Sequence, residues 1–183
     1  MKRWLAAAVL MALLQAQGTA QAVPSFAEVR AAHAVSDLTL TDRHGTPLQT
    51  LRVDKAQRRL PWVPLEDLSP ALRQAIVLSE DRRFWDHSGV DWAAVATSAW
   101  GNLVNTRTRG ASTLTMQLAG LIDDGLARPR GGRSAWQKLG QVVVAGQLER
   151  GWTKSQILEA YLNAVPFRGE VVGVNALSQT LFG

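Results

Sequence analysis

The chain has 183 residues, of which 46% are hydrophobic and 19% charged, and this balance excludes a disordered or wholly membrane-embedded protein. It contains no cysteine, so disulfide bridges, thiolate metal sites and a lipid-modified cysteine are excluded. The formal charge of +5 favours an anionic partner such as a phospholipid surface or a pyrophosphate, and the absence of any nucleic-acid-binding motif argues against a nucleic acid.

Residues 1–22 have the pattern of an export signal. Two basic residues precede an apolar run from Trp4 to Leu14, and Ala20-Gln21-Ala22 then offers a small-x-small cleavage site. The apolar run is much shorter than the roughly 20 residues that a helix needs to span a bilayer. We therefore expect a signal peptide, with a membrane anchor as the alternative, and a chain that acts outside the cytoplasm.

Residues 23–68 are expected to form a β-hairpin region and a linker. Apolar residues alternate along 38–40 and recur along 48–53, and the turn formers Asp42-Arg43-His44-Gly45 lie between them. No other stretch carries a clear strand signal, so this hairpin is the one β element that the sequence predicts.

From residue 69 onward the periodicity is helical. Ser69 suits a helix cap and Pro70 the first helical position, so we expect a helix that ends at Glu80. Asp91 is the expected cap of a core helix, because apolar residues recur after it at spacings of three and four as far as residue 103.

A shorter helix is expected after Gly110. Its cap candidates are Ser112 and Thr113, whose hydroxyls can accept a hydrogen bond from the first turn. The glycines and the proline of residues 123–132 then predict a mobile loop.

Two further helices complete the pattern. The first is expected over 133–150, with Lys138 and Gln141 side by side on one face. Its apolar face is expected to consist of Trp136, Leu139, Val143 and Leu148. The second begins with a capping box at 153–156 and runs to Asn163. The chain is therefore predicted to be mainly α, with a small β element near its N-terminus.

Two clusters of polar residues are the candidates for chemistry. Residues 80–91 hold several carboxylates and His87, and Glu80 at a helix end could act as a general base. The alternative is structural, with Asp86 or Asp91 as a helix cap. Residues 110–117 form a helix start that could attract an anion or could be no more than a helix start. The three histidines share no metal-ligand spacing.

These clusters and three later segments identify a family. The first signature of the glycosyltransferase family 51 peptidoglycan polymerases resembles Glu80-Asp81-x-x-Phe84-x-x-His87-x-Gly89-x-Asp91, and the second resembles residues 110–117. Lys138 is similar to the lysine of the third signature, 157–163 to the fourth and 173–183 to the last. Five motifs in the same order identify residues 69–183 as a member of this family.

The resemblance implies a lysozyme-like, mainly α glycosyltransferase domain at the periplasmic side of the inner membrane. The implied donor is a growing glycan chain on undecaprenyl pyrophosphate, and the implied acceptor is lipid II. Glu80 would be the catalytic carboxylate that takes the proton of the acceptor hydroxyl. The implied substrate-binding residues are Asp81, Ser112, Thr113, Gln117, Lys138, Gln141 and Asn163.

The sequence departs from the family pattern at Gln141, where the family has a second glutamate. Glutamine cannot ionise, so no cofactor is assigned, because a divalent cation (Mg²⁺ or Mn²⁺) would lose this ligand. Met116, Pro166-Phe167 and Arg168-Gly169-Glu170 resemble the penicillin-binding protein 1C branch. That branch carries a transpeptidase domain that this sequence lacks, and we expect a truncated member.

Two alternatives to a polymerase remain from the sequence. One is a lysozyme-like enzyme that cleaves glycan with a single dominant glutamate, although the second and fourth signatures argue against it. The other is a non-catalytic remnant that binds lipid II or the membrane, which the glutamine at position 141 supports. The sequence points to no protein partner.

Overall fold

The computed structural model describes residues 23–96, 112–123 and 135–183. The predicted signal peptide or anchor lies outside the described residues, as do almost all of the predicted loop at 123–132 and the part of the helix after Asp91 that begins at residue 97. No helix in the described ranges is both long and apolar enough to cross a membrane.

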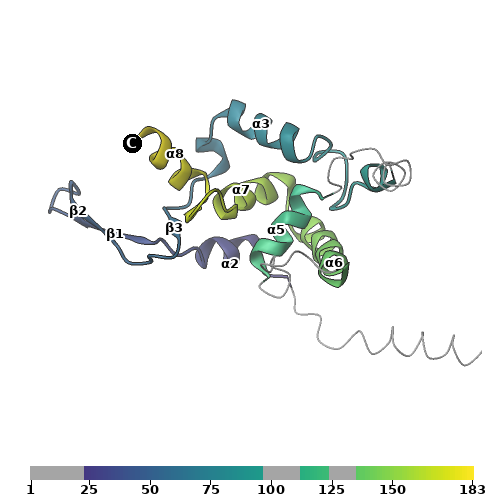
Figure 1. Cartoon of the computed structure of the whole chain (residues 1–183), viewed down its shortest axis with the longest axis horizontal. Helices are drawn as coiled ribbons and strands as arrows, with labels where there is room; N and C mark the ends of the chain where they lie inside the picture. The colour runs from purple at the N-terminus through teal and green to yellow at the C-terminus, as the bar shows by residue number, and fades with distance from the viewer. Residues whose placement is uncertain (1–22, 97–111, 124–134) are drawn as a thin grey trace, which may run out of the picture.

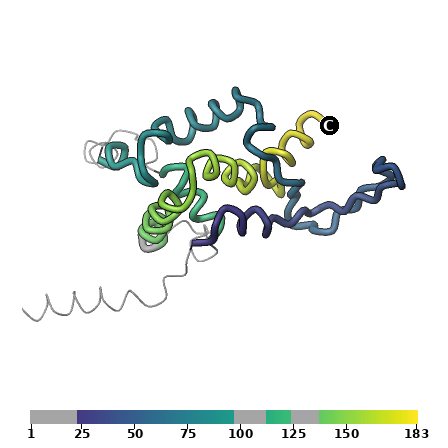
Figure 2. The backbone as a smooth tube through the Cα atoms, turned by 180° about the vertical axis from the view of Figure 1, so that it is seen from behind, coloured from purple at the N-terminus to yellow at the C-terminus, as the bar shows by residue number. Residues whose placement is uncertain are grey.

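The prediction of a mainly α fold with a small β-hairpin is confirmed. Helix α7 (Lys154–Ala164) lies in the middle of the molecule, with α3 (Pro70–Glu80) along one side and α2 (Phe26–Ala31) along the other (Figures 1 and 2). Helices α5 (Leu114–Ile122) and α6 (Ala135–Gly151) pack on one end of this arrangement, and α8 (Val174–Phe182) lies at the other end. A short 3-10 helix, η1 (Leu65–Asp67), precedes α3.

Helix α7 is the central helix of the domain. Its start is fixed by local hydrogen bonds, and its sides are covered by neighbouring elements. The predicted capping box is present: the Thr153 N–H donates to Gln156 Oε1 over 2.9 Å, and the Gln156 N–H donates to Thr153 Oγ1 over 3.2 Å. All residues from 157 to 163 are buried, so every face of this stretch touches a neighbouring element. A helix that is covered on all sides forms the core of the domain.

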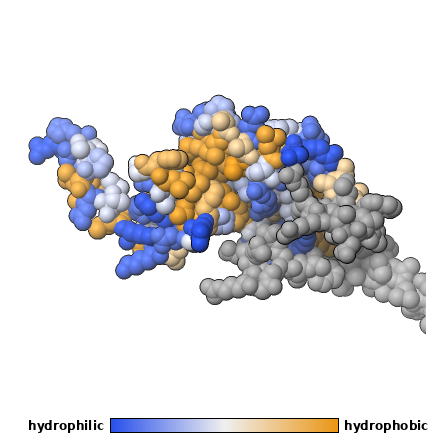
Figure 3. All heavy atoms as spheres, turned by 45° about the horizontal axis from the view of Figure 1, so that its top comes forward, coloured by the Kyte–Doolittle hydropathy of each residue, from blue (hydrophilic) through white to orange (hydrophobic). Residues whose placement is uncertain are grey.

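The hairpin consists of β1 (Asp37–Thr41) and β2 (Pro47–Arg52), which pair antiparallel. Asp42 closes the turn, because its Oδ1 accepts from the N–H groups of His44 and Thr46 over 2.7 and 2.9 Å. The ribbon projects from the body, so its apolar side chains are exposed (Figures 1 and 3). They are Leu38, Leu40, Leu48 and Leu51. The hairpin is therefore held by its own ladder and by contacts at its base.

The segment that precedes α3 is attached to the C-terminal third of the chain by contacts that the sequence does not predict. Helix α2 begins with a capping box between Ser25 and Glu28, and Phe26 packs edge-on against Trp62 and Trp152. The two-residue strands β3 (Arg58–Arg59) and β4 (Val171–Val172) pair in parallel. Strands of two residues are too short to show an alternating hydrophobic pattern in the sequence. The prediction of a single β element is therefore incomplete.

Helix α6 buries a different face from the one that its apolar residues predict. Leu139 and Val143 are 53% and 55% exposed, so their assignment to the core is wrong. Gln141 and Ala145 are instead completely buried, together with Leu148, which is buried as its place on the predicted apolar face requires. The reason is close backbone packing, because a Cβ on Gly89 would lie 3.0 Å from the Ala145 carbonyl carbon and oxygen.

The helical turn at 92–96 differs from its prediction in one respect. Asp91 is its cap, as predicted, since Asp91 Oδ1 accepts from the Ala94 N–H over 2.8 Å. Trp92 is the first residue of the apolar pattern that predicts a core helix after Asp91, but it is 69% exposed, so its place in the core is wrong. At the start of α3, Pro70 occupies the first turn as predicted, but the Ser69 side chain makes no capping hydrogen bond.

Candidate active site

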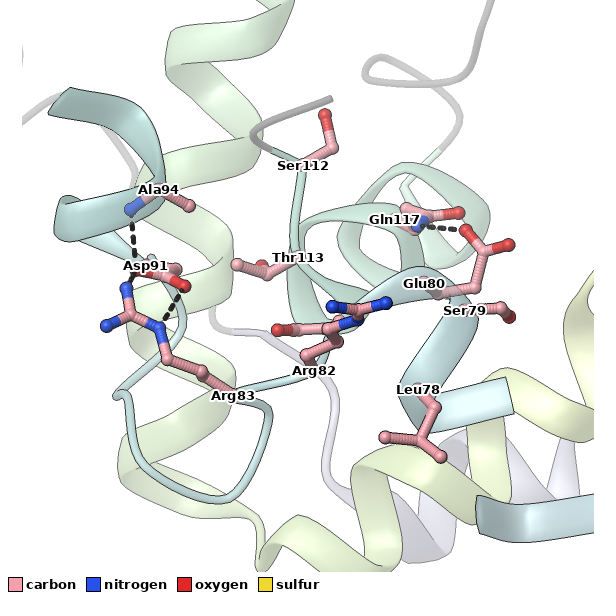
Figure 4. Close-up of a pocket in the computed structure, with 11 residues that line it drawn as sticks. Leu78, Ser79, Glu80, Arg82, Arg83, Asp91, Ala94, Ser112, Thr113 and Gln117 are labelled. Carbon is pink, nitrogen blue, oxygen red and sulfur yellow. Dashed lines mark hydrogen bonds and ion pairs between the residues drawn. The ribbon is translucent and has the colours of Figure 1, made fainter. Parts of the chain in front are cut away.

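A cavity of about 440 Å³ lies where the end of α3, the turn that follows it and the start of α5 meet (Figure 4). Residues 78–83 form one wall, Asp91 and Ala94 a second, and Ser112, Thr113 and Gln117 a third. Five of the eight predicted site residues line it, namely Glu80, Asp81, Ser112, Thr113 and Gln117. The fold thus brings together the two polar clusters of the sequence, residues 80–91 and 110–117.

Glu80 is the exposed carboxylate at the rim of this cavity. Its Oε2 accepts from Gln117 Nε2 over 3.1 Å, and Figure 4 shows the two side chains pointing toward each other. Gln117 Oε1 in turn accepts from the Tyr161 hydroxyl over 3.2 Å. Burial, and secondly the charge of Glu80, raises the pKa of Tyr161 to about 12, so that this hydroxyl is a proton donor at neutral pH. The chain of bonds fixes which way the Gln117 amide points.

Asp81 is buried and joins the two clusters. Its Oδ2 accepts from the Leu114 N–H over 3.0 Å and lies 2.9 Å from His87 Nε2. These bonds attach the end of α3 to the start of α5, and they place Glu80 beside Gln117. The structure therefore gives Asp81 a positioning role, and its contact with substrate stays a prediction.

The start of α5 has fewer free donors than its sequence suggests. Thr113 is the cap, as predicted: its Oγ1 accepts from the Met116 N–H over 3.2 Å and donates to the Gly89 carbonyl over 2.5 Å. The Leu114 N–H is bound by Asp81, so two of the first three N–H groups of the helix are already used. Anion binding at this end would rest on the remaining donor and on side chains.

Two arginines that the sequence did not single out as site residues also line the cavity. Arg83 forms a two-bond ion pair with Asp91, in which Arg83 Nε donates to Oδ2 over 2.9 Å. Hydrogen bonds from Arg83 lower the pKa of Asp91, so the Asp91 carboxylate stays ionised. Arg82 is exposed and lines the same cavity. It is the cation that could meet an anionic group of a substrate.

The structure does not bring the other three predicted residues to this cavity. Lys138 is exposed on α6, and Gln141 is completely buried on the same helix. Asn163 is 2% exposed, and its amide bonds the Val63 N–H and carbonyl over 2.9 and 2.8 Å. The geometry gives Asn163 the structural task of holding the segment before α3 on α7, which the family signature alone did not suggest.

We expect Gln141→Glu to destabilise the protein. We do not expect it to raise activity, although it restores the carboxylate that the family has at this position. Gln141 has no exposed surface, and a buried carboxylate costs about 2 kcal/mol or more in unfolding free energy. The measurement is urea unfolding at pH 7 and pH 5, with partial recovery at pH 5, where the buried carboxyl is more readily protonated.

Gln147→Glu, on the same helix but partly exposed, is the control and should melt like the wild type. An increase in activity of Gln141→Glu without loss of stability would show that residue 141 reaches the substrate.

Tyr161→Phe is expected to lower kcat by about threefold to tenfold and to leave KM nearly unchanged. The phenyl ring keeps the packing but loses the donor that orients Gln117, so the Gln117 amide can turn away from Glu80. The measurement is a double-mutant cycle with Gln117→Ala, in which Tyr161→Phe should have no further effect. Fully additive losses would mean that Tyr161 acts by another route.

The described residues do not form a metal centre. No three histidine, aspartate, glutamate or cysteine side chains in these ranges converge closely enough to hold an ion. Glu80 and Asp81 are adjacent acidic residues in the cavity wall, and they are bound to Gln117 and to His87 and Leu114, respectively. Within the described ranges the structure therefore shows no donor set for the divalent cation that the family resemblance raised.

Comparison with known proteins places the chain in one family. Residues 44–183 match a family model described as Transglycosylase. The chain is 36% identical over 147 residues to a biosynthetic peptidoglycan transglycosylase of Aeromonas hydrophila, a match that covers 75% of this chain and 60% of that protein. It is 41% identical over 142 residues to penicillin-binding protein 1C of Escherichia coli, covering 76% of this chain and 17% of that protein.

A third relative has an identity and a coverage similar to those of the first. The biosynthetic peptidoglycan transglycosylase of Nitrosospira multiformis is 35% identical over 141 residues, covering 75% of this chain and 59% of that protein. The chain thus spans about 60% of the length of the two biosynthetic peptidoglycan transglycosylases and 17% of the length of penicillin-binding protein 1C.

Proposed function

The chain belongs to the transglycosylase family, and from this membership and the geometry of the cavity we propose that it is a peptidoglycan glycosyltransferase. Its acceptor is lipid II, and its donor is a glycan chain on undecaprenyl pyrophosphate. The observation that carries the proposal is the position of Glu80, an exposed carboxylate at the rim of a cavity of about 440 Å³.

Glu80 acts as the general base. Gln117 holds Oε2, and within the described part of the chain no donor binds Oε1, so Oε1 can accept a proton from a hydroxyl in the cavity. The acceptor hydroxyl oxygen forms a bond to the anomeric carbon of the donor sugar, with inversion, while its proton passes to Glu80. The bond from that carbon to the pyrophosphate oxygen breaks, and the pyrophosphate leaves with the electron pair.

Arg82 supports the departing pyrophosphate. Its guanidinium lines the same cavity as Glu80, and Arg83 is less suited because Asp91 already occupies two of its donors. A guanidinium aimed at developing negative charge stabilises the transition state more than the ground state. Ser112, also in the wall, supplies a hydroxyl that can bind the same group.

The reaction takes place at the periplasmic surface of the inner membrane, because both substrates carry undecaprenyl chains. The export pattern of residues 1–22 and the net charge of +5 support this location. Lipid II, the glycan chain and the anionic membrane surface are the partners that this function requires.

Purified lipid II and the full chain in detergent test the proposal. We expect glycan polymer and release of undecaprenyl pyrophosphate. Shortening of preformed glycan strands, without polymer, would assign the site to a glycan-cleaving enzyme. Binding of lipid II without turnover would assign it to a non-catalytic lipid-binding protein. Either of these two results overturns the proposal.

A further inference from the structure

A second groove adjoins the catalytic cavity. It has a volume of about 420 Å³, and Leu78 and Arg82 line both spaces. Its other walls come from η1, α3, the turn after α3 and the first turns of α7. We propose that this groove binds a saccharide unit of the glycan chain beside the unit that reacts. The inference rests on the proposed function, because it names a part of the substrate of that same enzyme.

Trp85 supplies the platform for a sugar ring. Its side chain is 54% exposed, yet it packs edge-on against Phe84, with the ring centroids 4.9 Å apart. Phe84 is completely buried and has the Lys154 ammonium 4.5 Å from its ring centre. The indole is therefore an aromatic surface that faces water and is held in place from inside. Such surfaces are typical anchors of ligands with an apolar face and polar edges.

The polar groups of the groove suit a sugar better than a simple anion or an acyl chain. Arg73 and Gln74 lie on α3, and Ser155 lies at the start of α7. Together they offer hydrogen-bond donors and acceptors, which sugar hydroxyl and acetamido groups require in combination. A phosphate would not need the indole, and an acyl chain would not need the guanidinium and amide groups. A pyranose ring uses both.

The position of the groove gives it a function in polymerisation. Arg82 stands between the two spaces, so a chain that lies in both has one sugar near Glu80 and the next near Trp85. Binding energy from the second sugar would keep the chain on the enzyme between additions. We therefore expect the groove to set the length of the product.

Chitotetraose, an uncharged N-acetylglucosamine oligomer, is the probe for this groove. Calorimetry on the full chain in detergent should show binding, and Trp85→Ala should raise Kd about tenfold. Trp85→Phe should keep most of the affinity, because the aromatic surface remains. Trp92→Ala is the control: Trp92 is 69% exposed but does not line the groove, so Kd should not change.

Three results would overturn the inference. They are no binding of chitotetraose by the wild type, equal loss of affinity in Trp85→Ala and Trp92→Ala, and binding of inorganic pyrophosphate at Arg73 without binding of the sugar. The last result would assign the groove to an anion. A thermal melt of Trp85→Ala and Trp85→Phe checks that both variants are folded.

The same variants separate this inference from the proposed function. Glu80→Gln should lower the rate of polymerisation at least about 100-fold and leave chitotetraose binding unchanged. Trp85→Ala should still polymerise lipid II but give shorter strands. A wild type that binds the sugar through Trp85 without polymerising would refute the proposed function alone. If the wild type polymerises lipid II and Trp85→Ala changes neither strand length nor the Kd for chitotetraose, the saccharide-binding role of the groove alone would be refuted.

Discussion

Glu80→Gln is expected to lower the rate of glycan synthesis by at least about 100-fold, the share that general-base catalysis commonly contributes. The amide has the shape of the carboxylate, so Gln117 can still bind it, but it cannot take a proton at neutral pH. Because Glu80 is exposed, unfolding should be unaffected. The measurement is the initial rate with purified lipid II, together with a thermal melt.

Asp86→Asn is the matched control for this variant. Asp86 is also acidic and exposed and lies six residues further along the chain, but it does not line the cavity. Its neutralisation should change the rate little. Near-normal synthesis by Glu80→Gln, or an equal loss in Asp86→Asn, would remove Glu80 from its assigned role.

Gly173→Ala is expected to reduce the free energy of unfolding by at least about 3 kcal/mol, from backbone strain and from overpacking. Gly173 precedes α8 with a φ of 80°, and an added Cβ would lie 2.6 Å from the Asn163 carbonyl oxygen. Neither helix can yield easily, because Asn163 is also bonded to Val63 through its side chain. Urea unfolding in detergent measures the loss.

Gly169→Ala separates the clash from the strain. Gly169 also has a positive φ, 72°, but no atom lies within 4 Å of the place where a Cβ would be. It should therefore lose only about 1 kcal/mol. Equal losses in the two variants would mean that α8 does not pack closely against the end of α7.

The features predicted correctly from the sequence are those that depend on neighbouring residues. The turn at Asp42, the cap at Asp91 and the capping box at Thr153 each use a side chain that bonds a backbone group two to four residues away. Such signals survive in any fold. That Glu80 and Gln117 belong to one site was also predicted, but only through the resemblance to the family.

The features that the sequence did not predict depend on packing between distant elements. Helix α6 carries apolar residues on two faces, and periodicity cannot tell which face Gly89 will approach. Periodicity does not distinguish Tyr161 from the core residues of α7, and its contact with Gln117 follows only from the fold. Arg82 had no signal of its own within the first signature. Its role follows only from its position in the fold, where it lines both the catalytic cavity and the second groove.

The attachment of the N-terminal segment has a consequence for the order in which the protein folds. Its partners all lie at least 94 residues later: Trp62 and Leu65 donate to Glu159, Val63 bonds Asn163, and β3 pairs with β4. Closing a loop of this size costs chain entropy that no local contact repays. During synthesis residues 23–68 therefore emerge long before the surface on which they dock exists. Helix α7 has to form and pack on α5 first, and the closing of β3 on β4 becomes a late step whose rate depends on how quickly the C-terminal third folds.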